Sequence, residues 1–334
     1  MTAPAPAIVV PPQPWTGRFD GEGAEHRRWW QAVTPYALRT IPAPASASAS
    51  ASASAAARIP HRTRTAVLLG FRSDEGVRRN QGRVGAAAGP AAIRAALAPL
   101  AFHLDREVRD AGDVTVAGQS LEAGQARAGL AITRLLDAGQ LPVVLGGGHE
   151  TAFASYLGIA GSAAVREGLR AGVLNLDAHF DLRDEPVPSS GTPFLQMARA
   201  EAAAGRELQY AVVGISEPSN TRALFRTAQE LGVDYLLDED CSAAAAHAFV
   251  AAFLAQVDAL YLTIDLDVLP ASEAPGVSAP AAYGVPLPVV SAVCRQVAAS
   301  GKLLHLDVAE LNPGFDIDGR TAMVAARLVN TLLG

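Results

Sequence analysis

The chain is poor in cysteine and in basic residues. Its only cysteines are Cys241 and Cys294 in 334 residues. They are too few and too far apart for a disulfide framework or a thiolate zinc site, so we interpret each as a small core residue in a reducing compartment. Lys and Arg number 27 against 33 Asp and Glu, a net charge of −6. Because a nucleic-acid surface usually shows as a basic field, we expect no nucleic-acid partner.

The sequence also lacks long hydrophobic runs, although half of its residues are hydrophobic. No run reaches the roughly 18 residues of a membrane span, so we expect no membrane partner. Residues 1–14 have no basic start and are interrupted by prolines, which makes them a poor signal peptide. These features predict a cytoplasmic protein.

Composition divides the chain near residue 57. Residues 1–14 are rich in Pro and Ala, and residues 43–57 form a Pro-Ala-Ser repeat without large apolar side chains. We predict disordered tracts in an N-terminal segment, 1–57, and a catalytic domain over 58–334. Between the two tracts, an aromatic stretch containing Trp29 and Trp30 should pack on another part of the structure.

From residue 65 onward, short apolar runs alternate with helical patterns such as 91–100 and 121–138. This alternation predicts an α/β fold with a mostly parallel sheet covered by helices on both faces. The expected strands cover residues 66–69, 114–117, 141–145, 173–176, 210–215, 233–237, 259–264 and 302–308.

Acidic and histidine side chains follow three of these strands. Asp177, His179 and Asp181 alternate, and so do Asp265 and Asp267, which places each set on one face of an extended segment. Neither run contains a basic residue before Arg183, and buried aspartates need a partner. Ligands bind at the carboxyl ends of parallel strands, so we expect these groups to converge. The predicted metal ligands are His149, Asp177, His179, Asp181, Asp265 and Asp267.

Six ligands are too many for one catalytic zinc ion, which usually takes three from the protein. They suit two divalent ions bridged by carboxylate, and the mixture of oxygen and imidazole favours Mn²⁺ over Mg²⁺ or Ca²⁺. Such a pair can hold a bridging hydroxide at neutral pH, which predicts a hydrolase acting on an electrophilic carbon. The Gly146–148 turn lacks the Lys-Ser/Thr of a phosphate loop. We interpret it as bringing the backbone close to the metals.

The motifs resemble those of the ureohydrolases, the arginase–agmatinase family of binuclear manganese enzymes. They are Gly-Gly-Gly-His-Glu at 146–150, Asp-Ala-His-Phe-Asp at 177–181 and Asp-Leu-Asp at 265–267. The resemblance implies a three-layer α/β/α arginase-like fold with an eight-stranded sheet, and two Mn²⁺ per subunit held by the six ligands named above. It also implies a homo-oligomer, trimer or hexamer, and matches Glu310 to the glutamate that contacts the substrate's guanidinium or amidinium group.

Departures from the arginase pattern narrow the expected substrate. Phe194 stands where arginases carry a histidine thought to shuttle protons, which argues against a guanidino substrate. The segments 73–83 and 189–194 resemble the formimidoylglutamase subfamily, whose small-molecule substrate carries one amidinium and two carboxylates. Arg183 is a candidate for binding a carboxylate bidentately. The predicted substrate-binding residues are Arg183, Arg79, Asn80 and Ser190, with Arg78 and Arg83 as further cations.

The expected reaction is cleavage of N-formimidoyl-L-glutamate to L-glutamate and formamide, a step of histidine degradation. The bridging hydroxide attacks the formimidoyl carbon, Asp267 helps to stabilise the tetrahedral intermediate and relays a proton to the leaving amine, and Glu310 anchors the amidinium. The alternative within the enzyme class is a guanidino-acid hydrolase or agmatinase that releases urea. The alternative outside the enzyme class is a catalytically silent metal-binding regulator or scaffold. A deacetylase on a related fold is a weaker alternative, because it uses a single zinc ion.

Overall fold

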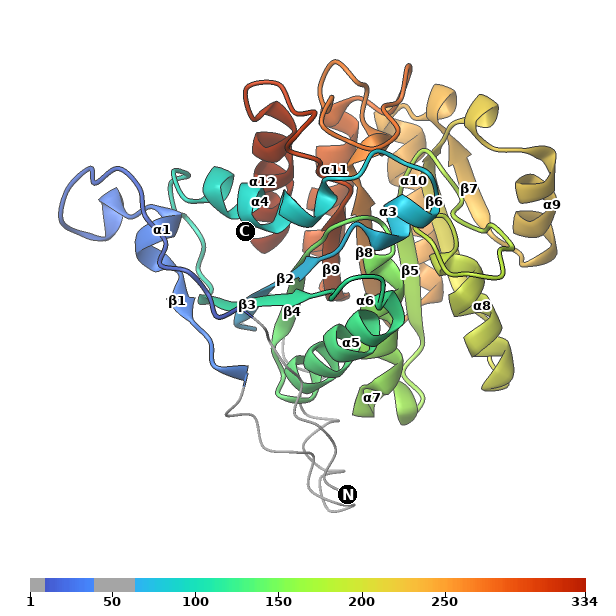
Figure 1. The fold of residues 1–334 in the computed structure, drawn as a ribbon, viewed down its shortest axis with the longest axis horizontal. Helices are drawn as coiled ribbons and strands as arrows, with labels where there is room; N and C mark the ends of the chain where they lie inside the picture. The colour runs from blue at the N-terminus through green and yellow to red at the C-terminus, as the bar shows by residue number, and fades with distance from the viewer. Residues whose placement is uncertain (1–9, 39–63) are drawn as a thin grey trace.

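In the computed structural model, which describes residues 10–38 and 64–334, the chain folds around one parallel sheet (Figure 1). The strands lie in the order β1-β3-β2-β4-β9-β8-β5-β6-β7. The sheet has nine strands, one more than the eight expected, because the two-residue β1 pairs with β3 at one edge. The strands are β1 (Thr34–Pro35), β2 (Ala66–Arg72), β3 (Val108–Thr115), β4 (Leu141–Leu145), β5 (Ala171–Leu176), β6 (Gln209–Ile215), β7 (Asp234–Leu237), β8 (Ala259–Asp265) and β9 (Leu303–Ala309).

Helices cover both faces of the sheet, which confirms the three-layer α/β/α prediction (Figure 1). One face carries α4 (Gly89–Leu97), α10 (Ala243–Gln256), α11 (Leu287–Ser300) and α12 (Arg320–Leu333). The other carries α5 (Leu121–Asp137), α6 (Thr151–Gly161), α8 (Pro193–Ala203) and α9 (Arg222–Glu230). The shorter helices are α1 (Trp29–Ala32), α3 (Glu75–Arg79) and α7 (Ala163–Arg166).

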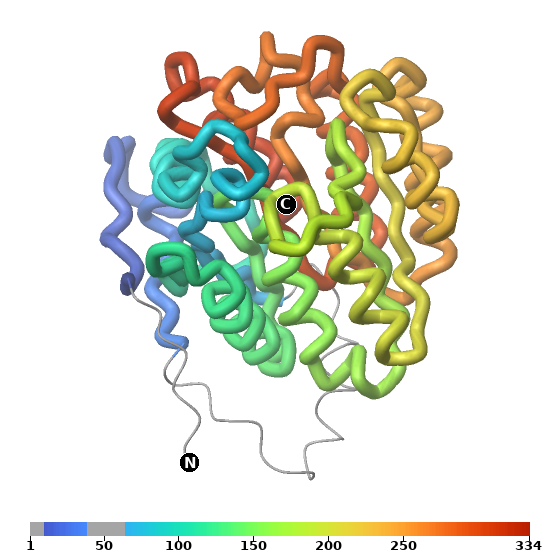
Figure 2. The backbone as a smooth tube through the Cα atoms, turned by 45° about the vertical axis from the view of Figure 1, so that its right-hand side comes forward, coloured from blue at the N-terminus to red at the C-terminus, as the bar shows by residue number. Residues whose placement is uncertain are grey.

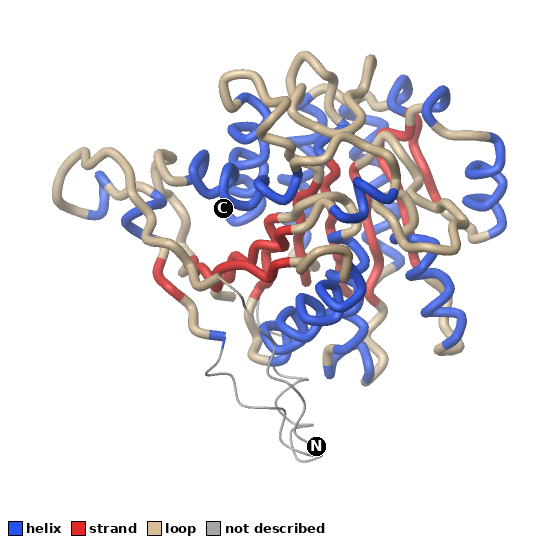
Figure 3. The backbone as a smooth tube through the Cα atoms, in the orientation of Figure 1, coloured by secondary structure: helices blue, strands red, loops and turns tan. Residues whose placement is uncertain are grey.

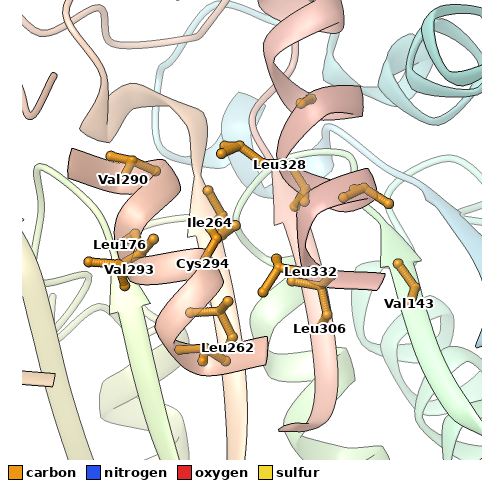
Figure 4. Packing of buried hydrophobic residues seen from close by; sticks show 14 of the residues in the cluster. Val143, Leu176, Leu262, Ile264, Val290, Val293, Cys294, Leu306, Leu328 and Leu332 are labelled. Carbon is orange, nitrogen blue, oxygen red and sulfur yellow. The ribbon is translucent and has the colours of Figure 1, made fainter. Parts of the chain in front are cut away.

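Alternating strand residues supply two separate cores. Leu262 and Ile264 of β8 face α11 and α12, where Val293 and Leu332 meet them (Figure 4). Tyr261, which precedes Leu262, points to the other face of the sheet and belongs to the opposite core with residues of α5 and α6. Because both faces are buried, the central strands show unbroken apolar runs rather than alternation, which is why the sequence reveals them.

The predicted strand at 114–117 is displaced, because β3 runs from Val108 to Thr115. Its charged residues hide the strand pattern in the sequence. Asp110 and Asp113 are buried, and Arg94 of α4 binds them with nitrogen–oxygen distances of 2.8 and 2.6 Å. The ion pairs compensate the charge of the buried carboxylates. The strand therefore contains charged residues that, in the sequence alone, argue against a buried strand.

The N-terminal aromatic stretch packs on the body, as predicted. Trp29 is fully buried, stacks near Trp15, and donates from Nε1 to Asn330 Oδ1 of α12 at 2.9 Å. Figure 2 shows this segment in blue beside the cyan helix α4. Further toward the N-terminus, Val10 bridges to Asp113. The predicted tract at 43–57 lies outside the described residues.

The sheet presents the carboxyl ends of its parallel strands at one edge, and long loops gather there (tan in Figure 3, above the sheet). In the described part of the chain, no helix combines the length and the apolar character that crossing a membrane requires. Because ligands bind beyond the carboxyl ends of parallel strands, the loops at this edge are the natural place for a binding site.

Replacing Trp29 with Ala should lower the free energy of unfolding by about 3–5 kcal/mol, because it removes a fully buried aromatic ring and the Asn330 hydrogen bond. Urea unfolding followed by circular dichroism measures the change. Trp30→Ala is the matched control, since Trp30 is only half-buried and its Nε1 donates to the exposed Arg18 carbonyl. Equal losses for the two variants would contradict the assigned role of Trp29.

Candidate metal centre

One group of predicted ligands surrounds the imidazole of His149, which follows β4 and its glycine turn. His149 Nδ1 lies 3.1 Å from Asp177 Oδ2, 2.9 Å from Asp181 Oδ2 and 3.2 Å from Asp265 Oδ2. The acids come from the ends of β5 and β8, neighbours in the sheet. Residues far apart in the sequence thus form one cluster, as the parallel topology requires.

A second group shares Asp177 with the first. His179 Nδ1 lies 3.5 Å from Asp177 Oδ1 and 3.1 Å from Asp267 Oδ2. The two oxygens of Asp177 therefore face the two different groups, which is the arrangement a bridging carboxylate needs. Each group of three could hold one metal ion: His149, Asp177 and Asp181 in the first, and Asp177, His179 and Asp267 in the second.

The backbone at the centre adopts conformations that cost energy. Asp181 has φ of 49° and Glu310 has φ of 69°, two of the four non-glycine residues with positive φ in the described chain. Non-glycine residues avoid this region unless the surroundings impose it, and such strain concentrates at functional sites. At Asp181 the strain coincides with a contact to the centre, since its Oδ2 lies 2.9 Å from His149 Nδ1.

Aromatic and hydroxyl groups fix the His149 ring. Its Nε2 lies 3.0 Å from Thr263 Oγ1, and the ring of Phe194 meets it edge-on, with centroids 5.4 Å apart. Phe194 is fully buried and stacks on Tyr210. Phe194 therefore supplies a rigid apolar wall beside the centre, where it offers no proton-transfer group.

The electrostatics of the centre reflect uncompensated negative charge. Burial raises the pKa of Asp181, and the Asp177 carboxylate raises it further, to about 6. Burial also raises the pKa of Asp265 well above its usual value, with Asp267 adding to the effect. For His149, burial lowers the pKa, but the surrounding carboxylates outweigh it and raise the pKa well above its usual value. All three shifts favour added positive charge.

The residues fit a pair of divalent ions. His149 Nδ1 is buried and has no hydrogen-bond partner among the described residues, although three carboxylate oxygens lie around it. A lone pair surrounded by carboxylates without a hydrogen bond is what a metal ligand set offers before the ion is added. Imidazole and carboxylate together suit Mn²⁺ and related ions, and no thiolate is present in either group.

Two further carboxylates lie beside the candidate metal ligands. Glu310 Oε1 accepts from the His149 backbone N–H at 2.8 Å, whereas its Oε2 is buried without a partner among the described residues. Glu150 accepts from the Ser73 hydroxyl at 2.7 Å and from the Gly76 N–H at 3.0 Å. Burial raises the pKa of Glu310, and the nearby Glu150 raises it further, to about 8. Glu310 Oε2 is thus available to a cationic ligand.

Three of the predicted substrate-binding residues lie together. Asn80 Nδ2 donates to Ser190 Oγ at 3.1 Å, and the Arg183 N–H donates to the Gly191 carbonyl at 2.9 Å. The Arg183 side chain is half-exposed, and Glu185 at 4.0 Å is its nearest acid in the described residues. Because this contact is long and the side chain is half-exposed, the guanidinium can turn to bind a carboxylate of a ligand.

The fourth, Arg79, has internal partners. Its guanidinium binds Glu75 at 2.9 Å, Glu122 at 2.7 Å and the Pro188 carbonyl at 2.9 Å. These contacts hold α3 against the loop that carries Ser190, so Arg79 helps to shape the rim of the site. Its role in substrate binding stays a prediction, as do the ligand roles of the six metal candidates.

Several buried residues beside the centre have no predicted role from the sequence. Glu150, Asn175, Thr263 and Asp307 are completely buried and contact the centre or its supports. Asn175 Nδ2 donates to Asp177 Oδ2 at 2.9 Å, for example. The position of Glu150 near the centre follows from the sequence, because Glu150 comes directly after His149 in the glycine turn. Thr263 and Asp307 could not be inferred in this way, since each resembles an ordinary strand residue.

The chain belongs to the arginase family, whose model matches residues 64–334. This confirms the resemblance to the ureohydrolases, and the protein is a hydrolase of that family. A formimidoylglutamase of Nocardia farcinica is 57% identical over 319 residues, covering 96% of this chain and 95% of its own. A formimidoylglutamase of Chromobacterium violaceum is 47% identical, covering 95% and 96%. The crystal structure of Trypanosoma cruzi formiminoglutamase with Mn²⁺ has a TM-score of 0.73 at 25% identity, covering 83% and 94%.

Raising the pH from 6 to 8 should destabilise the metal-free protein. Asp181 and Glu310, with folded pKa values of about 6 and about 8, bind protons more tightly when folded, so their contribution is lost as the pH rises. The raised pKa of His149 acts with the same sign. Thermal unfolding of metal-stripped protein measures the trend, and added Mn²⁺ should remove it. Stability that rises with pH in the metal-free protein would contradict this charge balance.

Proposed function

We propose that this protein is a binuclear manganese hydrolase that cleaves N-formimidoyl-L-glutamate to L-glutamate and formamide. The observation that carries the proposal is the pair of ligand groups that share Asp177. Relatives that span nearly the whole chain support the substrate, since those of Nocardia farcinica and Rhodococcus opacus are both formimidoylglutamases.

The metals would be held by His149, Asp177, Asp181 and Asp265 in one position and by Asp177, His179 and Asp267 in the other. Two bound Mn²⁺ ions would supply a strong nucleophile from water at neutral pH and neutralise charge that develops on the substrate. The neighbouring groups keep the ligands in place: Asp267 Oδ1 accepts from the Ala178 N–H at 3.3 Å, and Asp265 Oδ1 from the Asp267 N–H at 2.9 Å.

The substrate's charges match the site at both ends. Glu310 Oε2, buried and unpaired within the described residues, would accept the amidinium N–H groups and hold the formimidoyl carbon over the centre. Arg183, free at the rim, would bind a carboxylate of the glutamate portion. Asp267, in the ligand group with His179, would relay a proton from the attacking water to the departing amine.

Phe194 favours a formimidoyl over a guanidino substrate. It fills the space beside His149 with a buried apolar ring, stacked on Tyr210 at a centroid distance of 4.3 Å. The ring brings no proton-transfer group to the position where the arginase pattern has a histidine, and this argues against hydrolysis of a guanidino substrate. The cytoplasmic location, the trimer or hexamer and the boundary at residue 57 stay predictions.

Incubating the Mn²⁺-loaded protein with N-formimidoyl-L-glutamate should release glutamate and formamide in equal amounts, measured by enzymatic glutamate assay and NMR. A protein carrying Asp177→Ala is the control and should release neither. Urea released from agmatine or a guanidino acid, with formimidoylglutamate left intact, would overturn the substrate. Metal binding without turnover of any of these compounds would favour the scaffold alternative.

Replacing Arg183 with Ala should raise KM for formimidoylglutamate about 10- to 100-fold, because a charge-assisted hydrogen bond to a substrate carboxylate is lost. The value of kcat should change far less, since Arg183 lies away from the metal ligands. Arg199→Ala is the matched control, because Arg199 is half-exposed and binds Asp184 in the same region. An unchanged KM for the Arg183 variant would rule out this carboxylate contact.

A further inference from the structure

Glu150, the residue after His149, is completely buried but belongs to neither ligand group. Its Oε1 accepts from the Ser73 hydroxyl at 2.7 Å and from the Gly76 N–H at 3.0 Å. Its Oε2 is buried without a partner among the described residues. Because a buried carboxylate with an unpaired oxygen costs free energy, packing alone does not explain this side chain. Both hydrogen bonds of its carboxylate join it to residues 73–76, where α3 begins.

Two glycines make room for the Glu150 carboxylate. A Cβ at Gly76 would lie 2.6 Å from Glu150 Cδ, closer than the ~3.5 Å at which non-bonded carbon atoms pack, and a Cβ at Gly148 would meet Glu150 Oε2. Gly76 lies inside α3 and does not have a positive φ, so its backbone conformation does not require glycine. The close approach of Glu150 therefore accounts for the glycine at position 76.

The glycine turn also holds the residue predicted to bind the amidinium. Glu310 Oε1 accepts from the His149 N–H, and the Glu310 N–H donates to the Gly147 carbonyl, both at 2.8 Å. On its other side the turn binds the segment that leads into α3, since the Gly148 N–H donates to the Ser73 carbonyl at 3.0 Å. The turn therefore lies between Glu310 and the start of α3.

The other end of α3 reaches the residues predicted to bind a substrate carboxylate. Asn80, which follows the helix, donates from Nδ2 to Ser190 Oγ at 3.1 Å. A Cβ at Gly191 would lie 2.8 Å from Arg183 Cδ and 3.4 Å from Asn80 Nδ2, so these two side chains flank the same glycine. At 1.5 Å per residue, the chain from Gly76 to Asn80 spans about 6 Å along the helix axis. Helix α3 is thus a short spacer between the two ends of the site.

We propose that Glu150 is a positioning residue that fixes α3 against the glycine turn and thereby sets the distance between the amidinium and carboxylate ends of the substrate site. A fixed distance selects substrates by length, and one methylene group more or less is worth about 10-fold or more in a fitted site. The glutamate derivative is then preferred over the shorter aspartate derivative. The inference rests on the proposed function, which supplies the two ends of the substrate, and it assigns length selectivity to a residue outside the ligand groups.

Four variants separate this role from simple packing. Glu150→Met keeps a long side chain but has no oxygen to accept from Ser73 or Gly76. Gly76→Ala retains Glu150 and adds a methyl group that displaces its carboxylate from α3. Glu150→Gln keeps an acceptor oxygen and should preserve both contacts. Gln125→Leu is the matched control, because it removes the 2.9 Å hydrogen bond from Gln125 Nε2 to the Glu150 carbonyl but leaves Oε1 and its partners unchanged.

Steady-state kinetics of the Mn²⁺-loaded proteins give the ratio of kcat/KM for N-formimidoyl-L-glutamate to that for N-formimidoyl-L-aspartate. Hydrogen exchange of residues 73–80 reports whether α3 is held, and calorimetric titration reports Mn²⁺ affinity. We expect Glu150→Met and Gly76→Ala to lower the ratio about 10-fold, mainly through KM for the glutamate derivative, and to speed exchange. Their Mn²⁺ affinity should match the wild type. Glu150→Gln and Gln125→Leu should keep the wild-type ratio.

A wild-type ratio in either Glu150→Met or Gly76→Ala would overturn the proposal, and if Glu150→Met does not fold, Gly76→Ala carries the test. An equal loss of selectivity in Gln125→Leu would also overturn it, because the effect would then be one of packing. So would a fall in kcat for both substrates alike. Wild-type protein that turns over neither formimidoyl amino acid would contradict the proposed function instead, so the two failures are distinguishable.

Discussion

Mutual repulsion among buried carboxylates is the constraint on which this structure depends. Asp177, Asp181, Asp265 and Asp267 converge at the carboxyl edge of the sheet, and Glu310 lies beside them. At an effective dielectric constant near 20, two like charges about 4 Å apart repel by about 4 kcal/mol. Two imidazoles cannot balance this negative charge. The raised pKa values of Asp181 and Glu310 result from burial together with the repulsion of neighbouring carboxylates. The divalent cations of the proposed function would remove this repulsion, and the same positive charge would then serve hydrolysis.

The parallel sheet turns local sequence patterns into this convergence. Each motif follows a strand, and all strands in such a sheet end at the same edge, so the six ligand candidates could be predicted to meet from the sequence alone. The division of these six residues into two ligand groups could not be predicted from the sequence. It depends on the order β4-β9-β8-β5 and on the left-handed turn at Asp181, which brings its carboxylate back to His149.

The sequence gives least information where polar groups satisfy one another inside the fold. The start of β3 was predicted too late, because its aspartates look exposed in the sequence. Their partner, Arg94, lies in a separate helix. In the sequence, Arg79 and Arg183 are equally plausible substrate-binding cations. In the structure, Arg79 forms a short ion pair with Glu122, whereas Arg183 makes only a long contact with Glu185. Thr263 and Asp307 resemble routine strand residues until the register places them side by side behind His149. In each case the deciding fact is a tertiary partner that local patterns do not specify.

The most direct test of the account is a count of manganese ions together with their magnetic coupling. We predict that metal-stripped protein takes up two Mn²⁺ per chain by calorimetry. Its electron paramagnetic resonance spectrum should show an exchange-coupled pair, because both oxygens of Asp177 face a ligand group. One ion per chain, or two ions without exchange coupling, would contradict a shared binuclear centre.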